Sequence, residues 1–481
     1  TIQTADDIAT ATARTAANKA IANEGFVRTR DVEYVPVTFH LVGRNDGTGR
    51  ISEHKVMDQL CALNEDFAPV GIQFYLRNGT FNYVNNTTIY DNHLAAVNGP
   101  MFFAKDNRSV NIWIPNSADT NPDDQSVTLG YFDSSRDWLV VSKNEIGGPN
   151  STLSHEMGHF LSLLHPFNGW DGVYFLEENT PADATSPYGV PTELADGSNC
   201  TTAGDMICDT PADYGNGFGW TQCEFTLNVL DPVGQPIDPD EVNWMTYFLL
   251  CDVDDYHFSD EQAELMMIDL TMNNDRTYLR QLPDPTVEII EEAPQLISPI
   301  DAVTVPGYNE VLLEWSYVPG AQAYLLEIAR TANFTVSPQR QIVYGTSVIV
   351  DNLDANRTYY WRVRPFNPLY TCDNESLVES FKTDATTATV EPPAVIDWQI
   401  SPNPVRQGHD IAINLQTVEQ LETVITLTDL TGRQVQAPRQ HTFTVGDNQL
   451  NLPVETLANG LYVLRIQTAT GQLTEKLVIA N

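Results

Sequence analysis

The chain has 481 residues, 64 of them acidic and 25 basic, which gives a formal net charge of −39. A surface of this charge repels phosphate backbones and anionic lipid headgroups, so nucleic acid and membrane surfaces are not expected as partners. The sequence contains no apolar stretch of roughly eighteen residues or more, so no transmembrane segment is expected, and its length predicts about three domains.

The first part of the chain is predicted to be an arm followed by alternating strands and helices. Residues 1–33 are rich in Ala and Thr and are interpreted as an N-terminal arm or the remnant of a pro-segment. Because no signal segment is visible at the start, we expect a processed or trimmed form. Residues 34–285 are interpreted as one domain in which helices back a sheet. The expected strands are 35–42, 71–76, 109–115 and 138–141, and the expected helices are 51–67, one capped by Asn150 or Ser151, and one capped by Ser259.

Residues 166–255 are rich in Gly, Pro, Asp and Asn, and we expect them to be built mainly of loops. They contain four of the six cysteines of the chain, Cys200, Cys208, Cys223 and Cys251. An even, clustered set without CxxC spacing indicates two disulfides formed in an oxidising compartment. The sequence leaves three pairings open, and it also leaves open whether Cys61 and Cys372 are free.

A Pro-rich, acidic linker near residues 283–298 precedes a region of alternating apolar and polar residues, which is typical of sandwich strands. This pattern places Tyr359, Trp361 and Val363 on one face of a strand. The spacing of Leu353, Tyr359 and Val363 resembles the tyrosine-corner region of fibronectin type III modules. The resemblance implies an all-β sandwich over residues 286–388.

After a second linker, residues 389–481 contain SPNP, a D-L-T-G-R turn and the strand G-L-Y-V-L-R-I in that order. This region is similar to the C-terminal sorting domain of the type IX secretion system; the alternative is another small sandwich. The resemblance implies a second all-β sandwich, the type IX secretion machinery as a partner, and a secreted or cell-surface protein.

The segment LSHEMGHFLSLLHPF contains the pattern HExxHxxxxxH. His155 and His159 lie one helical turn apart, so both imidazoles project from one face at a separation suited to a single zinc ion. Glu156 is placed to act as general base, taking a proton from metal-bound water and delivering it to the leaving amine. His165 is the candidate third ligand. The alternative, a helix with ordinary core or surface histidines, is disfavoured because the chain has only 9 His.

A rigid helix cannot bring His165 back to the metal, so the chain must turn sharply after His159. The pattern resembles the metzincin motif HExxHxxGxxH, in which a Gly makes that turn, but this chain has Ser162 there. A left-handed backbone at Ser costs about 1 kcal/mol more than at Gly. In metzincins a Met-turn lies beneath the zinc, and NWMTY supplies Met245 for it. The resemblance also implies that Tyr247 stabilises the oxyanion.

The cysteines, the segment GDMICDTP and the later FSDEQ resemble the pappalysin (M43-like) branch of the metzincins. The resemblance implies an α/β (α+β) metzincin catalytic domain with a twisted mixed sheet and an active-site helix. It implies the disulfides Cys200–Cys223 and Cys208–Cys251. It also implies calcium, for which the candidate ligands are Asp205, Asp209, Asp213, Asp252, Asp254 and Asp255; the alternative is that these are solvated surface groups.

Some pappalysin relatives use acidic residues after the Met-turn to prefer Arg or Lys in the substrate. This chain instead has Phe248, Leu249 and Leu250, which predict an apolar pocket. The favoured function is a secreted zinc endopeptidase acting on proteins or peptides. The alternative is a binding or adhesion protein that keeps the metzincin frame and has lost catalysis.

Overall fold

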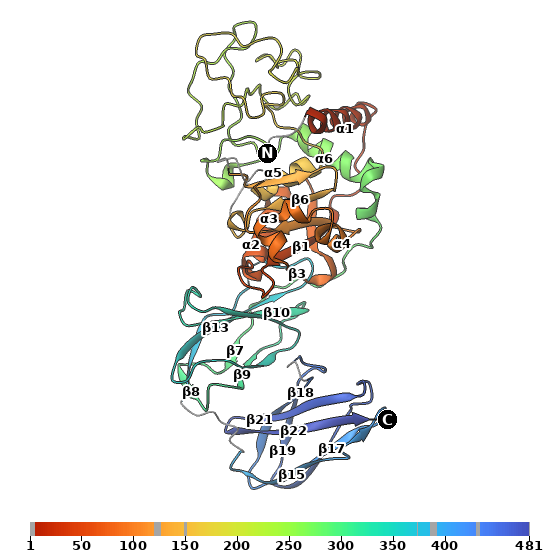
Figure 1. The fold of residues 1–481 in the computed structure, drawn as a ribbon, viewed down its shortest axis with the longest axis vertical. Helices are drawn as coiled ribbons and strands as arrows, with labels where there is room; N and C mark the ends of the chain where they lie inside the picture. Colours follow the sequence, from red (N-terminus) through yellow and green to blue (C-terminus); the bar gives the residue numbers. More distant parts are fainter. Residues whose placement is uncertain are drawn as a thin grey trace. The chain divides into compact units, whose positions relative to one another are not determined.

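The computed structural model describes residues 5–119, 127–148, 152–372, 374–384, 392–429 and 433–480. The chain forms two compact units (Figure 1). Unit 1 comprises Thr1–Val287 together with Asn367–Cys372, and unit 2 comprises Glu288–Phe366 together with Asp373–Asn481. No described helix is long and apolar enough to cross a membrane. The division into domains at residues 33, 285 and 388 stays a prediction.

Unit 1 is built on a mixed sheet in the order β2-β1-β4-β6-β5, with β3 also paired to β1. The first four strands of this order run parallel, whereas the edge strand β5 runs antiparallel to β6. β1 is buried along most of its length, as expected for a central parallel strand. The strands are β1 Glu33–Gly43, β2 Ile72–Leu76, β3 Asn82–Asn85, β4 Val110–Ile114, β5 Gly130–Asp133 and β6 Trp138–Val141.

The predicted helices are confirmed, with one starting point outside the described residues. α2 begins after Ser52, whose side chain accepts from the amide of Lys55. The predicted cap of α5 at Asn150 or Ser151 falls in the undescribed stretch 149–151. α6 begins with a capping box in which Ser259 and Gln262 bond to each other's backbone. The α-helices are α1 Ala5–Asn23, α2 Glu53–Phe67, α3 Thr87–Asn92, α4 Pro100–Ala104, α5 Thr152–Phe160 and α6 Asp260–Met272.

The predicted loop region is also confirmed. Residues 161–252, all of them described, contain no regular helix or strand, and they lie at one end of unit 1 beside α5 and α6 (Figure 1). The region has its own apolar cluster, which includes Trp170, Tyr214, Phe225 and Phe248. The loop therefore buries a core of its own although it lacks a backbone ladder.

The predicted disulfide pairing is wrong. The structure pairs Cys200 with Cys208 and Cys223 with Cys251, in place of Cys200–Cys223 and Cys208–Cys251. The tight turns between residues 200 and 208 bring the first two Cα atoms to 5.0 Å, which is a bridging distance. A third disulfide within unit 1 joins Cys61 on α2 to Cys372, so neither cysteine is free.

The first part of unit 2 is built of two sheets, β11-β10-β13-β14-β8 and β12-β9-β7. The predicted alternation is confirmed, because Tyr359, Trp361 and Val363 are all buried along β13. The hydroxyl of Tyr359 accepts a hydrogen bond from the amide of Asp354 at 2.7 Å, the contact that defines a tyrosine corner. The strands are β7 Leu296–Ser298, β8 Val303–Val305, β9 Val311–Trp315, β10 Ala323–Ala329, β11 Gln339–Val343, β12 Ser347–Val350, β13 Thr358–Phe366 and β14 Glu379–Thr383.

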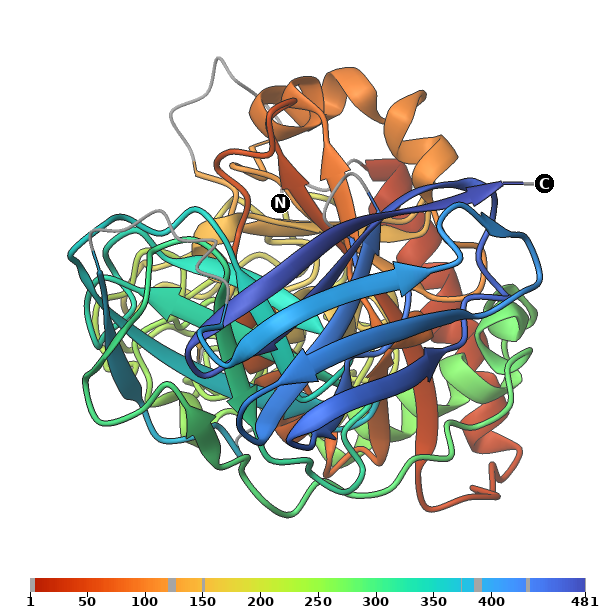
Figure 2. The same cartoon turned by 90° about the horizontal axis from the view of Figure 1, so that it is seen from below.

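The last part of unit 2 has the sheets β15-β17-β20 and β16-β22-β21-β18-β19, drawn in blue in Figure 2. The predicted strand G-L-Y-V-L-R-I lies within β21. The central residues 430–432 of the D-L-T-G-R turn are not described, but Arg433 and Asp429 at its ends form an ion pair. The strands are β15 Val395–Ser401, β16 Val405–Arg406, β17 Ile411–Thr417, β18 Leu421–Asp429, β19 Arg439–Phe443, β20 Gly446–Leu452, β21 Gly460–Thr468 and β22 Gly471–Ala480.

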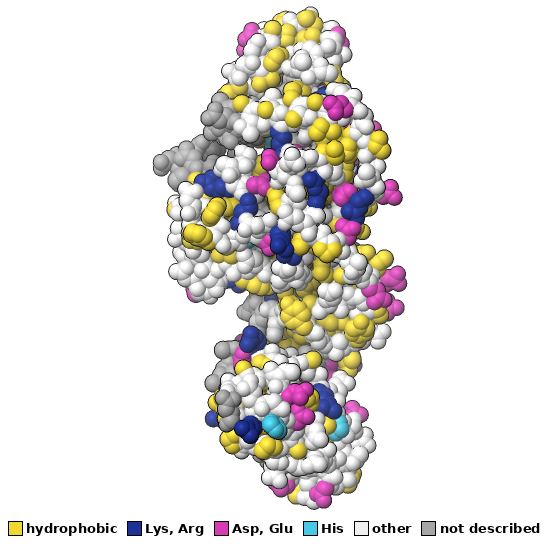
Figure 3. All heavy atoms as spheres, turned by 90° about the vertical axis from the view of Figure 1, so that its right-hand side faces the viewer, with side chains coloured by type: hydrophobic (Ala, Val, Ile, Leu, Met, Phe, Trp, Pro, Cys, Tyr) yellow, Lys and Arg dark blue, Asp and Glu magenta, His cyan; other side chains and the backbone are white. Residues whose placement is uncertain are grey.

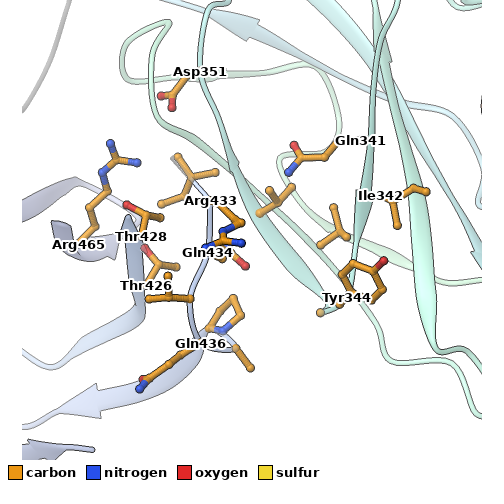
Figure 4. A pocket seen from close by; sticks show the side chains of 17 residues that line it. Gln341, Ile342, Tyr344, Asp351, Thr426, Thr428, Arg433, Gln434, Gln436 and Arg465 are labelled. Carbon is orange, nitrogen blue, oxygen red and sulfur yellow. The ribbon is translucent and has the colours of Figure 1, made fainter. Parts of the chain in front are cut away.

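A cavity of about 410 Å³ lies within unit 2, between β11–β12 and the segment that follows β18 (Figure 4). Its lining includes Gln341 and Tyr344 from one side and Arg433 and Arg465 from the other. None of the histidines of the HExxH segment lines it. On the face of the molecule in Figure 3, acidic and basic side chains are interspersed. That face therefore carries no single large patch of one charge.

Candidate metal centre

The active-site helix α5 carries the first candidate residues. His155 and His159 lie one turn apart, with ring centroids 4.7 Å from each other. The helix packs closely on the edge strand β5, since a Cβ atom at Gly130 would come within 2.9 Å of Thr152 and 3.2 Å of Glu156. α5 is therefore fixed between the sheet on one side and the loop region on the other.

The chain reverses immediately after α5, as the sequence predicts. Ser162 has a φ of +76°, and two hydrogen bonds close a Schellman motif around it: Leu163 N to Gly158 O and Ser162 N to His159 O, both 3.0 Å. This turn carries His165 back toward the helix. The predicted left-handed conformation at Ser162 is confirmed.

The three imidazoles meet at their Nε2 atoms. Nε2 of His155 lies 3.1 Å from that of His159 and 3.1 Å from that of His165, and the last two are 3.0 Å apart. Nitrogens held at about 2.0–2.1 Å by one tetrahedral zinc ion lie roughly 3.4 Å from one another, close to this spacing. Among the described residues of unit 1, these histidines form a group of the size and composition that one metal ion requires.

The opposite nitrogen of each ring has an acceptor that fixes its tautomer. Nδ1 of His155 bonds to Trp244 O at 2.8 Å, Nδ1 of His159 to Leu163 O at 2.9 Å, and Nδ1 of His165 to Asp171 Oδ1 at 2.5 Å. A carbonyl can only accept, so Nδ1 carries the proton and Nε2 keeps its lone pair. Three converging lone pairs repel one another unless a cation lies between them, and the site therefore fits a metal ion.

Burial keeps the rings of His155 and His159 uncharged. It lowers the pKa of His155 well below its usual value and the pKa of His159 to about 3. Neutral imidazole is the form that binds a metal.

Asp171 belongs to the site although the sequence reasoning missed it. Its Oδ1 accepts from His165, and its Oδ2 accepts from the amide of Gly169 at 3.0 Å. Burial acts to raise the pKa of Asp171, but the hydrogen bond and electrostatic interaction with His165 together with the hydrogen bond from Gly169 outweigh it, and the pKa is lowered. A carboxylate that orients a ligating histidine is a recurrent feature of metal sites. Its position six residues after His165 was the signal in the sequence.

Glu156 lies between α5 and β5 with 5% of its surface exposed. Burial raises the pKa of Glu156 to about 7, while the backbone amide of Phe132 bonds to the carboxylate and acts in the opposite direction. Phe132 belongs to the edge strand β5. Glu156 directly follows His155 on α5, and its carboxylate is fixed by the hydrogen bond from β5.

The predicted Met-turn underlies the helix. Met245 is fully buried, and a Cβ atom at Gly158 of α5 would collide with its sulfur. The preceding Trp244 supplies the carbonyl that holds His155. The turn is tied to α6 because Asn243 and Gln262 exchange two hydrogen bonds of 2.9 and 3.1 Å.

Tyr247 faces the imidazoles. Its ring centroid is 4.9 Å from that of His165 and 5.6 Å from that of His155. Burial raises the pKa of Tyr247, so its hydroxyl stays protonated and can donate a hydrogen bond. The ring centroid of Phe218 lies 6.3 Å from that of Tyr247. Phe218 also stacks on Tyr174, with ring centroids 5.0 Å apart.

The apolar pocket predicted from the residues after Tyr247 stays a prediction, because these residues lie in two different environments. Phe248 is fully buried in the apolar cluster of the loop region, whereas Leu249 and Leu250 are exposed. The half-exposed aromatic pair Tyr174 and Phe218 was not predicted. Apolar surface beside Tyr247 therefore comes from two separate segments of the loop region.

The six predicted calcium ligands do not come together as one group of three carboxylates among the described residues. The first three accept hydrogen bonds from protein amides and hydroxyl groups. Asp205 accepts from Thr210 and Ile207, Asp209 from Ser259 at the start of α6, and Asp213 from Asn216. Asp252 caps a 3₁₀ turn, Val253–Asp255, that contains the other two. Short side chains of this kind stabilise turns, and these contacts do not support a calcium cluster, so the six ligands stay a prediction.

Three fungal proteins named extracellular metalloprotease are similar to this chain: those of Colletotrichum graminicola (26% identity), Pyricularia oryzae (29%) and Verticillium alfalfae (25%). The alignments cover 37%, 38% and 40% of this chain and 57%, 67% and 62% of the relatives. The chain thus spans about three fifths of the length of these relatives.

Two further similarities are to a solved structure and to a family model. The solved FN1–FN3 domains of chicken CNTN1 match 40% of this chain and 67% of that one, at 13% identity and a TM-score of 0.15. Residues 399–480 match the family model described as a secretion system C-terminal sorting domain. The chain therefore carries a type IX sorting domain and is a secreted or cell-surface protein.

Proposed function

We propose that the chain is a zinc-dependent endopeptidase of the pappalysin-like metzincin type. The observation that carries the proposal is the convergence of three Nε2 lone pairs, each fixed by an acceptor on the opposite nitrogen. The fungal relatives named extracellular metalloprotease support the same class. The sorting domain supports export of the enzyme, by the type IX machinery, to where it would meet protein substrates.

His155, His159 and His165 would hold the zinc ion, and Asp171 would orient His165. Bound zinc would lower the pKa of water and polarise the scissile carbonyl. Glu156, fixed between α5 and β5, accepts the proton from the attacking water and delivers it to the leaving amine. The protonated hydroxyl of Tyr247 donates to the carbonyl oxygen as charge develops there.

The substrate class follows from the surface beside Tyr247. Tyr174 and Phe218 stack on each other, and each exposes about half its surface, 48% in both cases. Exposed stacked aromatics bind apolar side chains by burying their surface. The exposed Leu249 and Leu250 add to this apolar character. We therefore propose that the enzyme accepts an apolar residue next to the scissile bond, in place of Arg or Lys.

The decisive experiment replaces Glu156 with Gln and measures cleavage of a denatured-protein pool together with the zinc content. Loss of the general base predicts a rate lower by about 10²–10⁴-fold with zinc retained. The matched control is Glu264→Gln, the same change at an exposed position of α6. Unchanged cleavage by Glu156→Gln would remove Glu156 from the mechanism. A wild-type chain that binds zinc and cleaves nothing would favour the binding or adhesion alternative.

A further inference from the structure

The turn at Ser162 has a conformational cost that the rest of the protein must offset. Its φ of +76° lies in the left-handed region, where Ser is about 1 kcal/mol less stable than Gly. The Schellman bonds are made by the backbone and are the same for either residue. Some further contact specific to this chain is therefore expected at Ser162.

That contact comes from the N-terminal helix α1. The hydroxyl of Thr15 donates to Ser162 O at 2.9 Å, and the amide of Asn18 donates to Ser162 Oγ at 2.8 Å. Thr15 and Asn18 are both buried, with 0% and 2% of their surfaces exposed. α1 thus binds both the backbone and the side chain of the residue that turns the chain toward His165.

α1 is itself held in place by a buried carboxylate. Asp269 on α6 is fully buried and accepts from Arg14 at 2.6 and 2.8 Å and from Asn18 at 3.2 Å. The same carboxylate accepts from Arg276, which is 1% exposed and whose guanidinium also donates to Phe160 O, the last carbonyl of α5. One acid therefore connects α1 to the end of the active-site helix, and a fully paired buried network is rigid.

We propose that α1 is a positioning element of the metal centre: Thr15 and Asn18 hold Ser162 in its left-handed conformation and thereby fix His165 relative to His155 and His159. The proposal rests on the proposed function only in that the three histidines bind a metal. It replaces the interpretation of residues 1–33 as a mere arm or pro-segment remnant. In this chain, the contacts from α1 stabilise the left-handed conformation, which a glycine would adopt without strain.

The test is a double-mutant cycle between Asn18→Ala and Ser162→Gly, read out as zinc affinity by chelator competition on the full chain. Loss of an outer contact to a ligand typically costs 10–100-fold in metal affinity, so we expect Asn18→Ala to weaken zinc binding about tenfold. Ser162→Gly alone should change zinc affinity little. In the Ser162→Gly background, Asn18→Ala should cost less than about twofold, because glycine has no hydroxyl to hold and no strain to offset.

This coupling separates positioning from general packing. If Asn18 only docks α1 through Asp269, its removal will cost the same zinc affinity in both backgrounds, which would overturn the proposal. Thr12→Val is the matched control on the same helix, compared with Thr15→Val, which should weaken zinc binding. Equal affinities for these two variants would also contradict the proposal. Hydrogen exchange over α1 confirms that each variant is folded.

The outcomes are distinct from those that test the enzyme itself. A wild-type chain that binds no zinc would overturn both proposals at once. A wild-type chain that binds zinc and cleaves protein, with Asn18 and Ser162 uncoupled, would overturn only the role of α1. Zinc binding with the expected coupling but without cleavage would support the role of α1 and reject the peptidase.

Discussion

The sandwiches of unit 2 and the loop region 161–252 of unit 1 bury their chains in different ways. In unit 2 the strands pair with one another, and alternate side chains fill the core, as along β17, where Ile411, Ile413 and Leu415 are buried. In the loop region a buried polar side chain often satisfies the backbone instead. Asp231, for example, is fully buried and accepts from the amides of Ala195, Val233 and Gln235.

This difference determines which amino-acid replacements destabilise each part. A sandwich depends on apolar volume, and its backbone bonds survive most side-chain replacements. The loop region depends on particular oxygen atoms, because a buried amide without an acceptor costs about 1–3 kcal/mol. Five of the residues implicated in the proposed chemistry, namely Ser162, His165, Asp171, Met245 and Tyr247, lie in this second kind of structure. Single polar replacements there should therefore alter metal binding.

The largest effect is expected for Asp231→Ala. Three backbone amides lose the charged acceptor that they share at once, and a hydrogen bond to a charged group contributes about 1.5 kcal/mol, so the loop region should be destabilised by about 4 kcal/mol. Hydrogen exchange resolved by peptide measures this in the full chain. Asp231→Asn is the matched control, since it keeps one acceptor oxygen and should cost clearly less. Unchanged hydrogen exchange in residues 190–240 of Asp231→Ala would contradict the claim that the loop region depends on single acceptor oxygens.

The corresponding change in a sandwich is Leu464→Ala. Leu464 on β21 is fully buried in the C-terminal core, and loss of a large side chain there should cost about 3 kcal/mol. Exchange should rise over β17–β22, whereas zinc affinity should stay at the wild-type value. The nearby exposed Glu475, replaced by Ala, serves as control. A large loss of zinc affinity in Leu464→Ala would show that the two regions are not independent.

Asp171→Asn tests whether a single carboxylate oxygen determines the metal affinity of the site. The amide cannot supply the negative charge that holds the Nδ1 proton of His165, so zinc affinity should fall by about 10–100-fold with little change in stability. Chelator competition measures the affinity. Asp196→Asn, the same replacement at an exposed turn of the loop region, should have wild-type affinity. Equal affinities for both variants would exclude Asp171 from a role in metal binding.

The smallest effect is expected for Asp66→Asn, at the end of α2. Burial raises the pKa of Asp66 to about 6, with Ser154 of α5 donating to its carboxylate and acting in the opposite direction. The unfolded chain has a value near 4, so between about pH 4 and 6 the folded chain binds more protons and stability falls as pH rises. An Asn at this position does not ionise, so the variant keeps its stability as the pH rises. Asp66→Asn should therefore stabilise unit 1 by about 1 kcal/mol at pH 7 and have no effect at pH 4. Thermal unfolding of both chains at the two pH values measures it.

Local patterns predicted much of the fold correctly. α2 followed from the spacing of Val56, Leu60, Leu63 and Phe67, all of them buried, and the buried strand β6 was read correctly as 138–141. The antiparallel edge strand β5 is as short as β6, but it was missed because its sequence GYFD is only half buried and lacks the continuous apolar run of WLVV in β6. Residues 1–33 were interpreted as an arm from their Ala- and Thr-rich composition, and only the partners Asp269 and Ser162 explain why Thr15 and Asn18 are buried.

The site divides in the same way. His155, Glu156 and His159 lie on one helix, so their arrangement could be predicted from spacing, and the resemblance to the metzincin motif placed the turn at Ser162. The disulfide pairing could not, because it depends on how loops return on themselves. The role of the acidic residues in the loop region could not be predicted for the same reason: an Asp that caps a turn and an Asp that binds calcium look alike in a sequence.

By itself, the sequence determined the helix that presents two histidines and a glutamate, the reversal at Ser162, and the alternating strands of the sandwiches, because each depends on neighbours within a few residues. Only the tertiary structure decided which acceptor fixes each imidazole, which cysteines pair, and that α1 packs against the turn. These contacts join residues far apart along the chain, and their free energy depends on distance and burial, which no local pattern records.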